Sequence, residues 1–131
     1  MGTRSLTFVY SEKESKAPLL CMYRQFDGYM AGHGAQLAEF LNGMEIVNGY
    51  GKAKSKLANG MGCLAAQLIS NFKTETGNFY IYPVDSSDVG EEYSYHIYEN
   101  RVVAIETWGN AVIFDGTYSE FYEHCNADIV S

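Results

Sequence analysis

The chain has 131 residues, of which 47% are apolar, and a formal net charge of −7. This length and composition predict one domain, residues 1–131, with a packed core. A general nucleic-acid-binding protein needs a basic face, so the acidic charge argues against that class. The chain also contains eleven tyrosines, a residue that suits both half-buried sheet surfaces and binding surfaces.

The cysteines and the N-terminus bear on the compartment. Cys21, Cys63 and Cys125 form an odd set without a Cys-x-x-Cys pair. The first residues, Met-Gly-Thr-Arg-Ser, have no apolar signal-peptide core, and no apolar run reaches the length of a membrane span. These features predict a reducing cytoplasm, free thiols and no membrane partner.

The first part of the chain predicts two strands and a short helix. Residues 3–10 alternate between two faces, and a second strand is expected over 19–26 after Pro18. Asp27 and Gly28 are typical of a turn. Residues 34–41 then have apolar side chains at helical spacing, and Asn42-Gly43 is a suitable helix end.

A second helix is predicted over residues 60–73. Its apolar side chains form one stripe, made of Met61, Leu64, Ala65, Leu68 and Phe72. The segment before it, residues 48–58, reads as a loop with clustered lysines at positions 52, 54 and 56. These lysines suit a solvated loop, and a local basic pocket is the alternative.

Aromatic strands are predicted in the second half, over residues 78–84, 92–98, 101–108 and 111–114, with tight turns at 99–100 and 109–110. Residues 118–125 suit either a helical turn or an edge strand. The resulting order, ββααββββ, indicates an α+β domain with a mostly antiparallel sheet of five to six strands, and two helices inserted after the second strand.

Four segments carry a resemblance to known proteins: residues 2–5 (Gly-Thr-Arg-Ser), 23–29 (Tyr-Arg-Gln-Phe-Asp-Gly-Tyr), 33–34 (His-Gly) and 59–67 (Asn-Gly-Met-Gly-Cys-Leu-Ala-Ala-Gln). On these the chain resembles a group of small uncharacterised proteins of bacteriophages and prophages. The resemblance covers most of the chain and is most specific at 23–29. It implies a phage origin and a host-cytoplasmic location, and it implies no particular reaction.

The junction between the second strand and the first helix is the first candidate site. Arg24 could bind a phosphate or carboxylate through its planar fork, and Asp27 could contact a ribose hydroxyl. The helix start at His33-Gly34 could offer backbone N–H donors to an anion. The aromatic rings of Tyr23 and Tyr29 could stack on a base or sugar. The structural alternative is an Arg24–Asp27 ion pair that locks the turn.

The glycine-rich start of the second helix is the second candidate. Asn59, Gly60 and Gly62 would leave backbone donors exposed and let a ligand approach closely. Packing of this small-residue face against the first helix is the alternative. Together the two candidates predict a non-enzymatic protein that captures a small anionic, nucleotide-like ligand between them, without a cofactor.

A Cys63-dependent hydrolase is a rival hypothesis. Cys63 lies near a helix start, which favours its thiolate, and His96 on a later strand would be the base. The order of cysteine helix and histidine strand is that of papain-like and NlpC/P60-type hydrolases, although their nucleophile segment is absent. Metal binding is not expected, because the three histidines are widely separated and lack ligand spacing.

The tyrosine-rich strands support a third hypothesis. Aromatic side chains occupy both faces of residues 93–98, so one face could bind a partner or form a homodimer. An acidic, tyrosine-rich surface would suit a protein inhibitor of a basic host factor. The net charge supports this hypothesis more directly than it supports an anion pocket.

Overall fold

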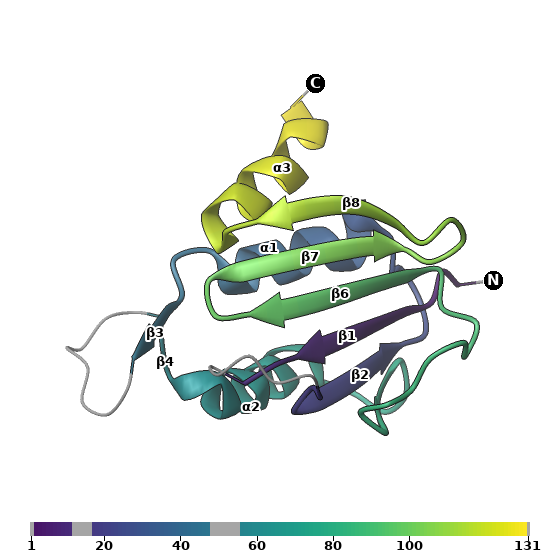
Figure 1. Cartoon of the computed structure of the whole chain (residues 1–131), viewed down its shortest axis with the longest axis horizontal. Helices are drawn as coiled ribbons and strands as arrows, with labels where there is room; N and C mark the ends of the chain where they lie inside the picture. Colours follow the sequence, from purple (N-terminus) through teal and green to yellow (C-terminus); the bar gives the residue numbers. More distant parts are fainter. Residues whose placement is uncertain (1, 12–16, 48–55, 131) are drawn as a thin grey trace.

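A mixed sheet of six strands forms the centre of the computed structural model, which describes residues 2–11, 17–47 and 56–130 (Figure 1). The strand order is β5-β2-β1-β6-β7-β8. The central pair, β1 and β6, is parallel, and the other four pairings are antiparallel. The strands are β1 (Ser5–Val9), β2 (Leu20–Arg24), β5 (Phe79–Tyr82), β6 (Tyr93–Tyr98), β7 (Arg101–Glu106) and β8 (Ala111–Gly116).

Helices α1 (Ala35–Leu41) and α2 (Gly60–Phe72) cover one face of this sheet (Figure 1). A π-helical turn, η1 (Met30–Gly34), leads directly into α1. Between α1 and α2 lies a short parallel pair, β3 (Glu45–Val47) and β4 (Leu57–Asn59). A third helix, α3 (Tyr118–Val130), follows β8 and packs against α1, β7 and β8.

The main core lies between the helices and the sheet. The predicted stripe of α2 is buried in full: Met61, Leu64, Ala65, Leu68 and Phe72. It packs with sheet residues that alternate toward the helices, such as Val9, Met22, Tyr95 and Ile97. Because burial of apolar area stabilises the fold at roughly 25 cal/mol per Å², this stripe fixes α2 on the sheet.

The opposite face of the sheet carries a second apolar cluster, formed by Leu6, Phe8, Cys21 and Tyr23. Two stacked pairs extend it along the sheet: the Tyr23 and Tyr82 rings are 4.7 Å apart, and the Tyr10 and Tyr98 rings 4.4 Å apart. The expected division of aromatic residues on β6 is confirmed, because Tyr95 faces the helices while His96 and Tyr98 face this second cluster.

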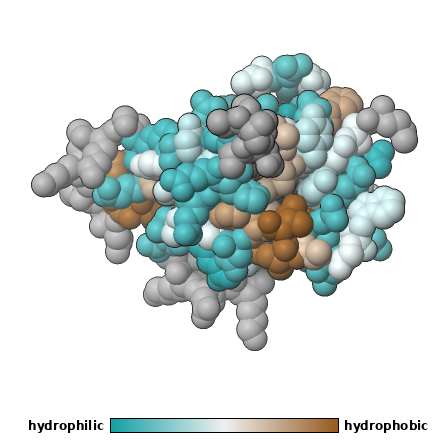
Figure 2. All heavy atoms as spheres, turned by 90° about the horizontal axis from the view of Figure 1, so that it is seen from above, coloured by the Kyte–Doolittle hydropathy of each residue, from teal (hydrophilic) through white to brown (hydrophobic). Residues whose placement is uncertain are grey.

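One edge of the sheet is β8, which leaves Val112 exposed. Seen from the side of α3 and β8, the surface is mainly hydrophilic, with apolar areas between the hydrophilic ones (Figure 2).

The predicted α+β class is confirmed, and four of the five pairings in the six-stranded sheet are antiparallel, as expected. The predicted order ββααββββ was incomplete, because it lacks the β3–β4 pair and a third helix. The sheet is mixed because β6 joins β1 on the side away from β2, in the same direction as β1. The segment after residue 117 is a full helix, and its Tyr118, Phe121 and Cys125 are buried. The loop lysines at 52 and 54 lie outside the described residues.

Candidate functional site: a groove between α1 and α2

A tightly packed turn joins β2 to α1. Asp27 adopts a left-handed conformation, with φ of 59°, and its carbonyl accepts a hydrogen bond from the His33 N–H at 2.7 Å. A Cβ on Gly32 would lie 2.5 Å from the Asp27 carbonyl oxygen, so this close approach requires glycine. The π-helical geometry of η1, frequent at functional sites, buries the His33 side chain beneath the sheet.

Arg24 and His33 form the centre of a buried hydrogen-bond chain. The Nη1 group of Arg24 donates to His33 Nδ1 at 3.1 Å and to Gln36 Oε1 at 2.6 Å. Since Nδ1 is then an acceptor, the imidazole carries its hydrogen on Nε2 and donates it to Thr7 Oγ1 at 2.7 Å. The chain therefore connects β1, η1, β2 and α1 and fixes the guanidinium in place.

Electrostatics keep this histidine neutral. Complete burial, followed by the nearby Arg24 cation, lowers the pKa of His33 to about 3. Burial also lowers the pKa of the Arg24 guanidinium below its ordinary value, although arginine remains charged in proteins. The result is a buried cation beside a neutral imidazole.

The Arg24 charge has no carboxylate partner among the described residues. Only 5% of the side chain is exposed, and its Nε is buried without a hydrogen-bond partner. One side of the guanidinium lies over the Phe79 ring, 4.9 Å from the ring centre. A buried charge without a counter-ion raises the free energy of the folded state. An anion bound beside Arg24 would lower it.

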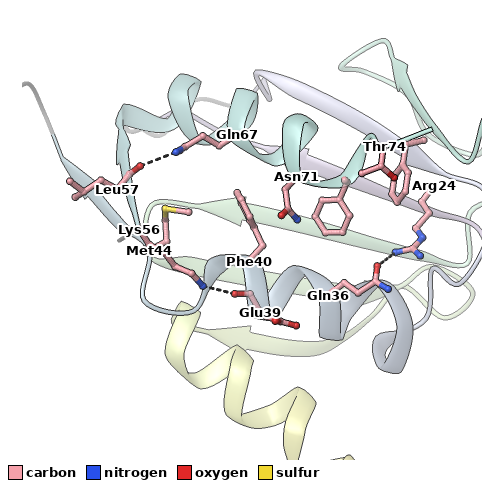
Figure 3. Close-up of a pocket in the computed structure, with 12 residues that line it drawn as sticks. Arg24, Gln36, Glu39, Phe40, Met44, Lys56, Leu57, Gln67, Asn71 and Thr74 are labelled. Atoms are coloured by element: carbon pink, nitrogen blue, oxygen red, sulfur yellow. Dashed lines mark hydrogen bonds between the residues drawn. The ribbon is translucent and has the colours of Figure 1, made fainter. Parts of the chain in front are cut away.

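Arg24 lines the α1–α2 groove, a hollow of about 800 Å³ between the two helices (Figure 3). This volume lies within the usual range for small-molecule sites, roughly 300–1,000 Å³. Aromatic rings and side-chain amides share the lining. The groove is lined by Arg24, Gln36, Glu39, Phe40, Met44, Lys56, Leu57, Gln67, Asn71, Phe72, Thr74 and Phe79.

Each end of the α1–α2 groove has a cation, and the two cations differ in their bonding partners. Arg24 and Gln36 lie at one end, and Lys56 lies at the other (Figure 3). The Lys56 ammonium donates to the backbone carbonyls of Glu39 and Asn42, at 2.7 and 2.8 Å. Because these carbonyls belong to the negative end of the α1 dipole, Lys56 serves as a cap for α1, while Arg24 has no such partner.

The predicted ligand residues of the 23–34 segment are divided by the fold. Arg24 lines the groove and His33 supports it from behind. Tyr23, the neighbour of Arg24 in β2, faces the opposite side of the sheet. Asp27 and Tyr29 are exposed at the turn, where the Tyr29 hydroxyl donates to Asp27 Oδ1 at 3.4 Å. The alternative Arg24–Asp27 ion pair does not form either.

The backbone donors predicted at the helix starts do not serve the groove. The Gly34 N–H is bonded to the Tyr29 carbonyl. Leu57 lies at the end of the groove opposite Arg24 (Figure 3), and Asn59 and Gly60 follow it in the chain at the start of α2. Gly62 is exposed, and a Cβ added to it would meet no atom within 4 Å. The two glycine-bearing helix starts therefore do not lie side by side.

Cys63 and His96 lie on opposite sides of the sheet, so His96 is not available as a base for Cys63. Cys63 packs with the helix-side core, whereas His96 stacks on Phe8 in the second cluster, 5.0 Å between ring centres. His96 is hydrogen-bonded through Nδ1 to the Tyr10 hydroxyl at 2.8 Å and through Nε2 to Ser94 Oγ at 3.1 Å. Burial lowers its pKa to about 4.

Neither a metal centre nor a membrane span occurs in the described part of the chain. No group of three His, Cys, Asp or Glu residues there could hold a metal ion. No helix there has both the length and the apolar character needed to cross a membrane.

Most groove residues were missed by sequence reasoning, although the helices carried a signal. Gln36 and Phe40 are four residues apart on α1, and Gln67 and Asn71 are four residues apart on α2. Such pairs lie on one helix face, at the border of each apolar stripe. The spacing of residues within one helix does not show how two helices pack. It therefore could not show that these two borders face one another.

No family model, curated protein or solved structure matches the chain.

Proposed function

We propose that the protein binds a small anionic, nucleotide-like ligand in the α1–α2 groove and carries out no reaction on it. The observation that carries the proposal is Arg24, a buried cation that lines the groove without a carboxylate partner among the described residues. An anion in the groove would supply the missing counter-charge through charge-assisted hydrogen bonds. No base or nucleophile is required for this role.

The lining suits a ligand with a flat organic part. Phe40 and Phe72 pack edge to face, with ring centres 6.4 Å apart, and both line the groove. Aromatic walls bind flat rings through stacking and apolar contact. Asn71 offers an amide with both donor and acceptor atoms on the same wall. A nucleobase or a similar heterocycle needs these two features together.

Native mass spectrometry of the protein purified from cells is the first test. A small molecule that leaves on denaturation, with the mass of a nucleotide or a related anion, would support capture and identify its class. The same preparation of the Arg24→Met variant should carry none. Met approximates the length of Arg without its charge, but it also removes the donor to His33 Nδ1, so circular dichroism of the variant must first show that it is folded.

Arg101→Met is the matched control for loss of one arginine. Arg101 is exposed and pairs with Asp115 at 2.9 Å, away from the groove. This variant should retain the bound molecule, or the affinity for added adenosine monophosphate, at the wild-type level. Equal binding by the wild type and a folded Arg24→Met variant would contradict the proposed function.

The surface around Trp108 favours a second candidate function, contact with a basic partner protein. Trp108 is 83% exposed, and it lines a hollow with Glu92, Tyr93 and Glu106. Exposed tryptophan beside carboxylates suits a lysine or arginine side chain. Capture of a host protein that is lost in Trp108→Ser and retained in Arg24→Met would favour this candidate over the groove.

A further inference from the structure

We propose that the surface around Trp108 binds an arginine-rich segment of a partner protein, with one arginine side chain in each of two hollows beside the indole ring. The inference rests on the second candidate function, contact with a basic partner, and it is independent of the α1–α2 groove. The recognised group is the guanidinium, and two guanidinium groups are bound.

Trp108 is the residue that the two hollows share. The first hollow, of about 280 Å³, is lined by Glu92, Tyr93, Glu106 and Trp108. The second hollow, of about 460 Å³, is lined by Asp88, Glu91, Thr107 and Trp108. Small-molecule sites usually measure roughly 300–1,000 Å³, so one hollow is below this range and the other is in its lower half. These sizes suit single side chains of a protein better than a whole metabolite.

Hydrogen bonds hold the two hollows in place. The Thr107 hydroxyl donates to the Glu91 carbonyl at 2.6 Å, and the Thr107 N–H donates to the Glu92 carbonyl at 3.0 Å. These bonds join the turn between β7 and β8 to the segment before β6, at one end of the sheet (Figure 1). The Glu91 carboxylate accepts from the backbone N–H groups of Asp88 and Val89, at 3.3 and 2.8 Å. The backbone that carries Trp108 and the Glu91 carboxylate are therefore positioned before a partner binds.

The charge of the lining argues for a cationic ligand. Four carboxylates line the two hollows, and no cation does so among the described residues. Arg4 reaches the same loop, since its Nη1 lies 3.1 Å from the position that a Cβ on Gly90 would occupy, but it lines neither hollow. A cationic group would therefore find acceptors in both hollows, whereas an anion would be repelled.

The exposure of Trp108 indicates that the indole ring itself contacts the ligand. The side chain is 83% exposed, the highest value among the large apolar side chains that the structure describes. Tryptophan attracts cations more strongly than the other aromatic side chains do, and it is enriched among the residues that dominate binding at protein interfaces. An indole ring shared by two carboxylate-lined hollows can thus contact a cation in each.

Arg101 shows within this chain how arginine uses an aromatic ring and a carboxylate together. Its Nε and Nη2 donate to the two oxygens of Asp115, both at 2.9 Å, and its guanidinium carbon lies 5.5 Å from the centre of the Tyr98 ring. A guanidinium can stack on a ring and form a forked pair, whereas an ammonium is a compact and strongly hydrated charge. The surface around Trp108 offers a ring and carboxylates, and none of the arginines of this chain lines it. Arginine is therefore the side chain that fits both hollows.

Fluorescence provides the test, because Trp108 is the only tryptophan in the chain and reports binding at this surface directly. Titrations with blocked hexa-arginine and hexalysine peptides, at about 50 mM salt to limit screening, compare the two cations at equal charge. We expect both peptides to change the fluorescence, and hexa-arginine to bind roughly five- to tenfold more tightly. Equal affinity for the two peptides would overturn the preference for arginine.

One variant for each hollow tests whether both are used. Glu106→Gln removes a carboxylate from the first hollow, and Asp88→Asn removes one from the second. Asparagine also tolerates the left-handed backbone at position 88, where φ is 56°. Each change should weaken hexa-arginine binding by roughly two- to fivefold. Weaker binding in only one of the two variants would overturn a site with two hollows.

Glu123→Gln is the control for net charge, since Glu123 is exposed on α3 and lines neither hollow. Its affinity for hexa-arginine should equal that of the wild type. If Glu123→Gln weakened binding as much as Glu106→Gln does, the peptide would be responding to the net charge of the chain alone, and the proposed site would be overturned.

Two further variants separate this inference from the proposed groove. A folded Arg24→Met variant should bind hexa-arginine as the wild type does. Trp108→Ser should lose peptide binding, measured by calorimetry, and keep its affinity for adenosine monophosphate. Full peptide binding by Trp108→Ser would overturn the role of the indole ring. No fluorescence change of the wild type with either peptide would overturn both this inference and the second candidate function, and it would leave anion capture in the groove standing.

Discussion

The Nη1 group of Arg24 donates a hydrogen bond to Nδ1 of His33 over 3.1 Å, and the two side chains are 5% and 0% exposed. A protonated imidazole could not accept this hydrogen bond, so the bond requires His33 to be neutral. Protonation would also place two buried positive charges in contact. The position of the guanidinium that lines the groove therefore depends on the charge state of a histidine that lies outside the groove lining.

The first prediction concerns acid stability. The folded-state pKa of His33 is about 3 and that of His96 about 4, both below the ordinary value of 6.5. Between these values the unfolded chain binds more protons than the folded one, so stability falls as pH decreases from about 6.5 toward 4. The expected loss is up to about 1.4 kcal/mol per pH unit for each histidine.

Urea unfolding, followed by circular dichroism at about pH 7, 6 and 5, measures this slope. His33→Gln should have a shallower slope than the wild type, whatever its stability at neutral pH, and so should His96→Gln. His124→Gln is the control, since His124 is exposed. A wild-type slope retained in both buried variants would show that these histidines are protonated in the folded state.

The second prediction concerns Thr7, whose hydroxyl accepts the Nε2 hydrogen of His33 at 2.7 Å. Thr7→Val keeps the shape of the side chain and leaves this buried N–H without a partner. The expected loss in free energy of unfolding is about 1–3 kcal/mol. Thr74→Val, at an exposed position, should change stability by less than about 0.5 kcal/mol. Equal stability of the two variants would contradict the assigned hydrogen-bond chain.

The parts of the fold that could be predicted are those determined by residues close together in the sequence. The stripe of α2 follows from five residues within one helical pattern, and all five are buried. The start of α3 also had a local signal: the Thr117 side chain and the Glu120 backbone N–H bond at 3.1 Å, and the Glu120 side chain bonds back to the Thr117 N–H at 2.8 Å. This Thr-x-x-Glu capping box was overlooked.

The parallel pairing of β1 with β6 was not predictable from local patterns. Ser5 pairs with Tyr93 across most of the chain length, and strand periodicity gives the two faces of a strand without naming its neighbour. The prediction of the candidate site from the sequence had the same limit. Arg24 was identified from its chemistry, whereas the opposing wall with Asn71 and Phe72 exists only because α2 packs across from α1.

The third prediction contrasts two glycines that the sequence places in similar helix starts. Gly32→Ala should destabilise the fold by roughly 1–3 kcal/mol, because the new Cβ would meet the Asp27 carbonyl. Gly62→Ala should stabilise it by up to about 1 kcal/mol, since α2 gains a better helix former at an exposed position without a clash. Thermal unfolding of both variants measures the two changes.

Ligand binding distinguishes the two roles that glycine could have at position 62. If its backbone donors served an anion, alanine would crowd the ligand and weaken binding. Because Gly62 lies outside the groove lining, Gly62→Ala should bind adenosine monophosphate as the wild type does. If Gly62→Ala were more stable than the wild type but bound adenosine monophosphate more weakly, the start of α2 would have to be part of the ligand site.

The fourth prediction concerns the three thiols. Cys21 is fully buried, and burial raises its pKa to about 12, so almost none of it is thiolate at neutral pH. Cys125 is also buried, while Cys63 is half-buried beside Gln67, whose Oε1 lies 3.8 Å from its Sγ. A disulfide reagent should therefore modify one thiol quickly in the folded protein and all three after unfolding.

Cys63→Ala should abolish the fast phase and leave the two slow thiols unchanged, as mass analysis of the labelled peptides would show. The rate of the fast phase also bears on catalysis. Because His96 lies on the far side of the sheet, it cannot act as the base for the Cys63 thiol, and His96→Gln should leave the rate of the fast phase unchanged. A slower fast phase in a folded His96→Gln variant would contradict this placement of the two side chains.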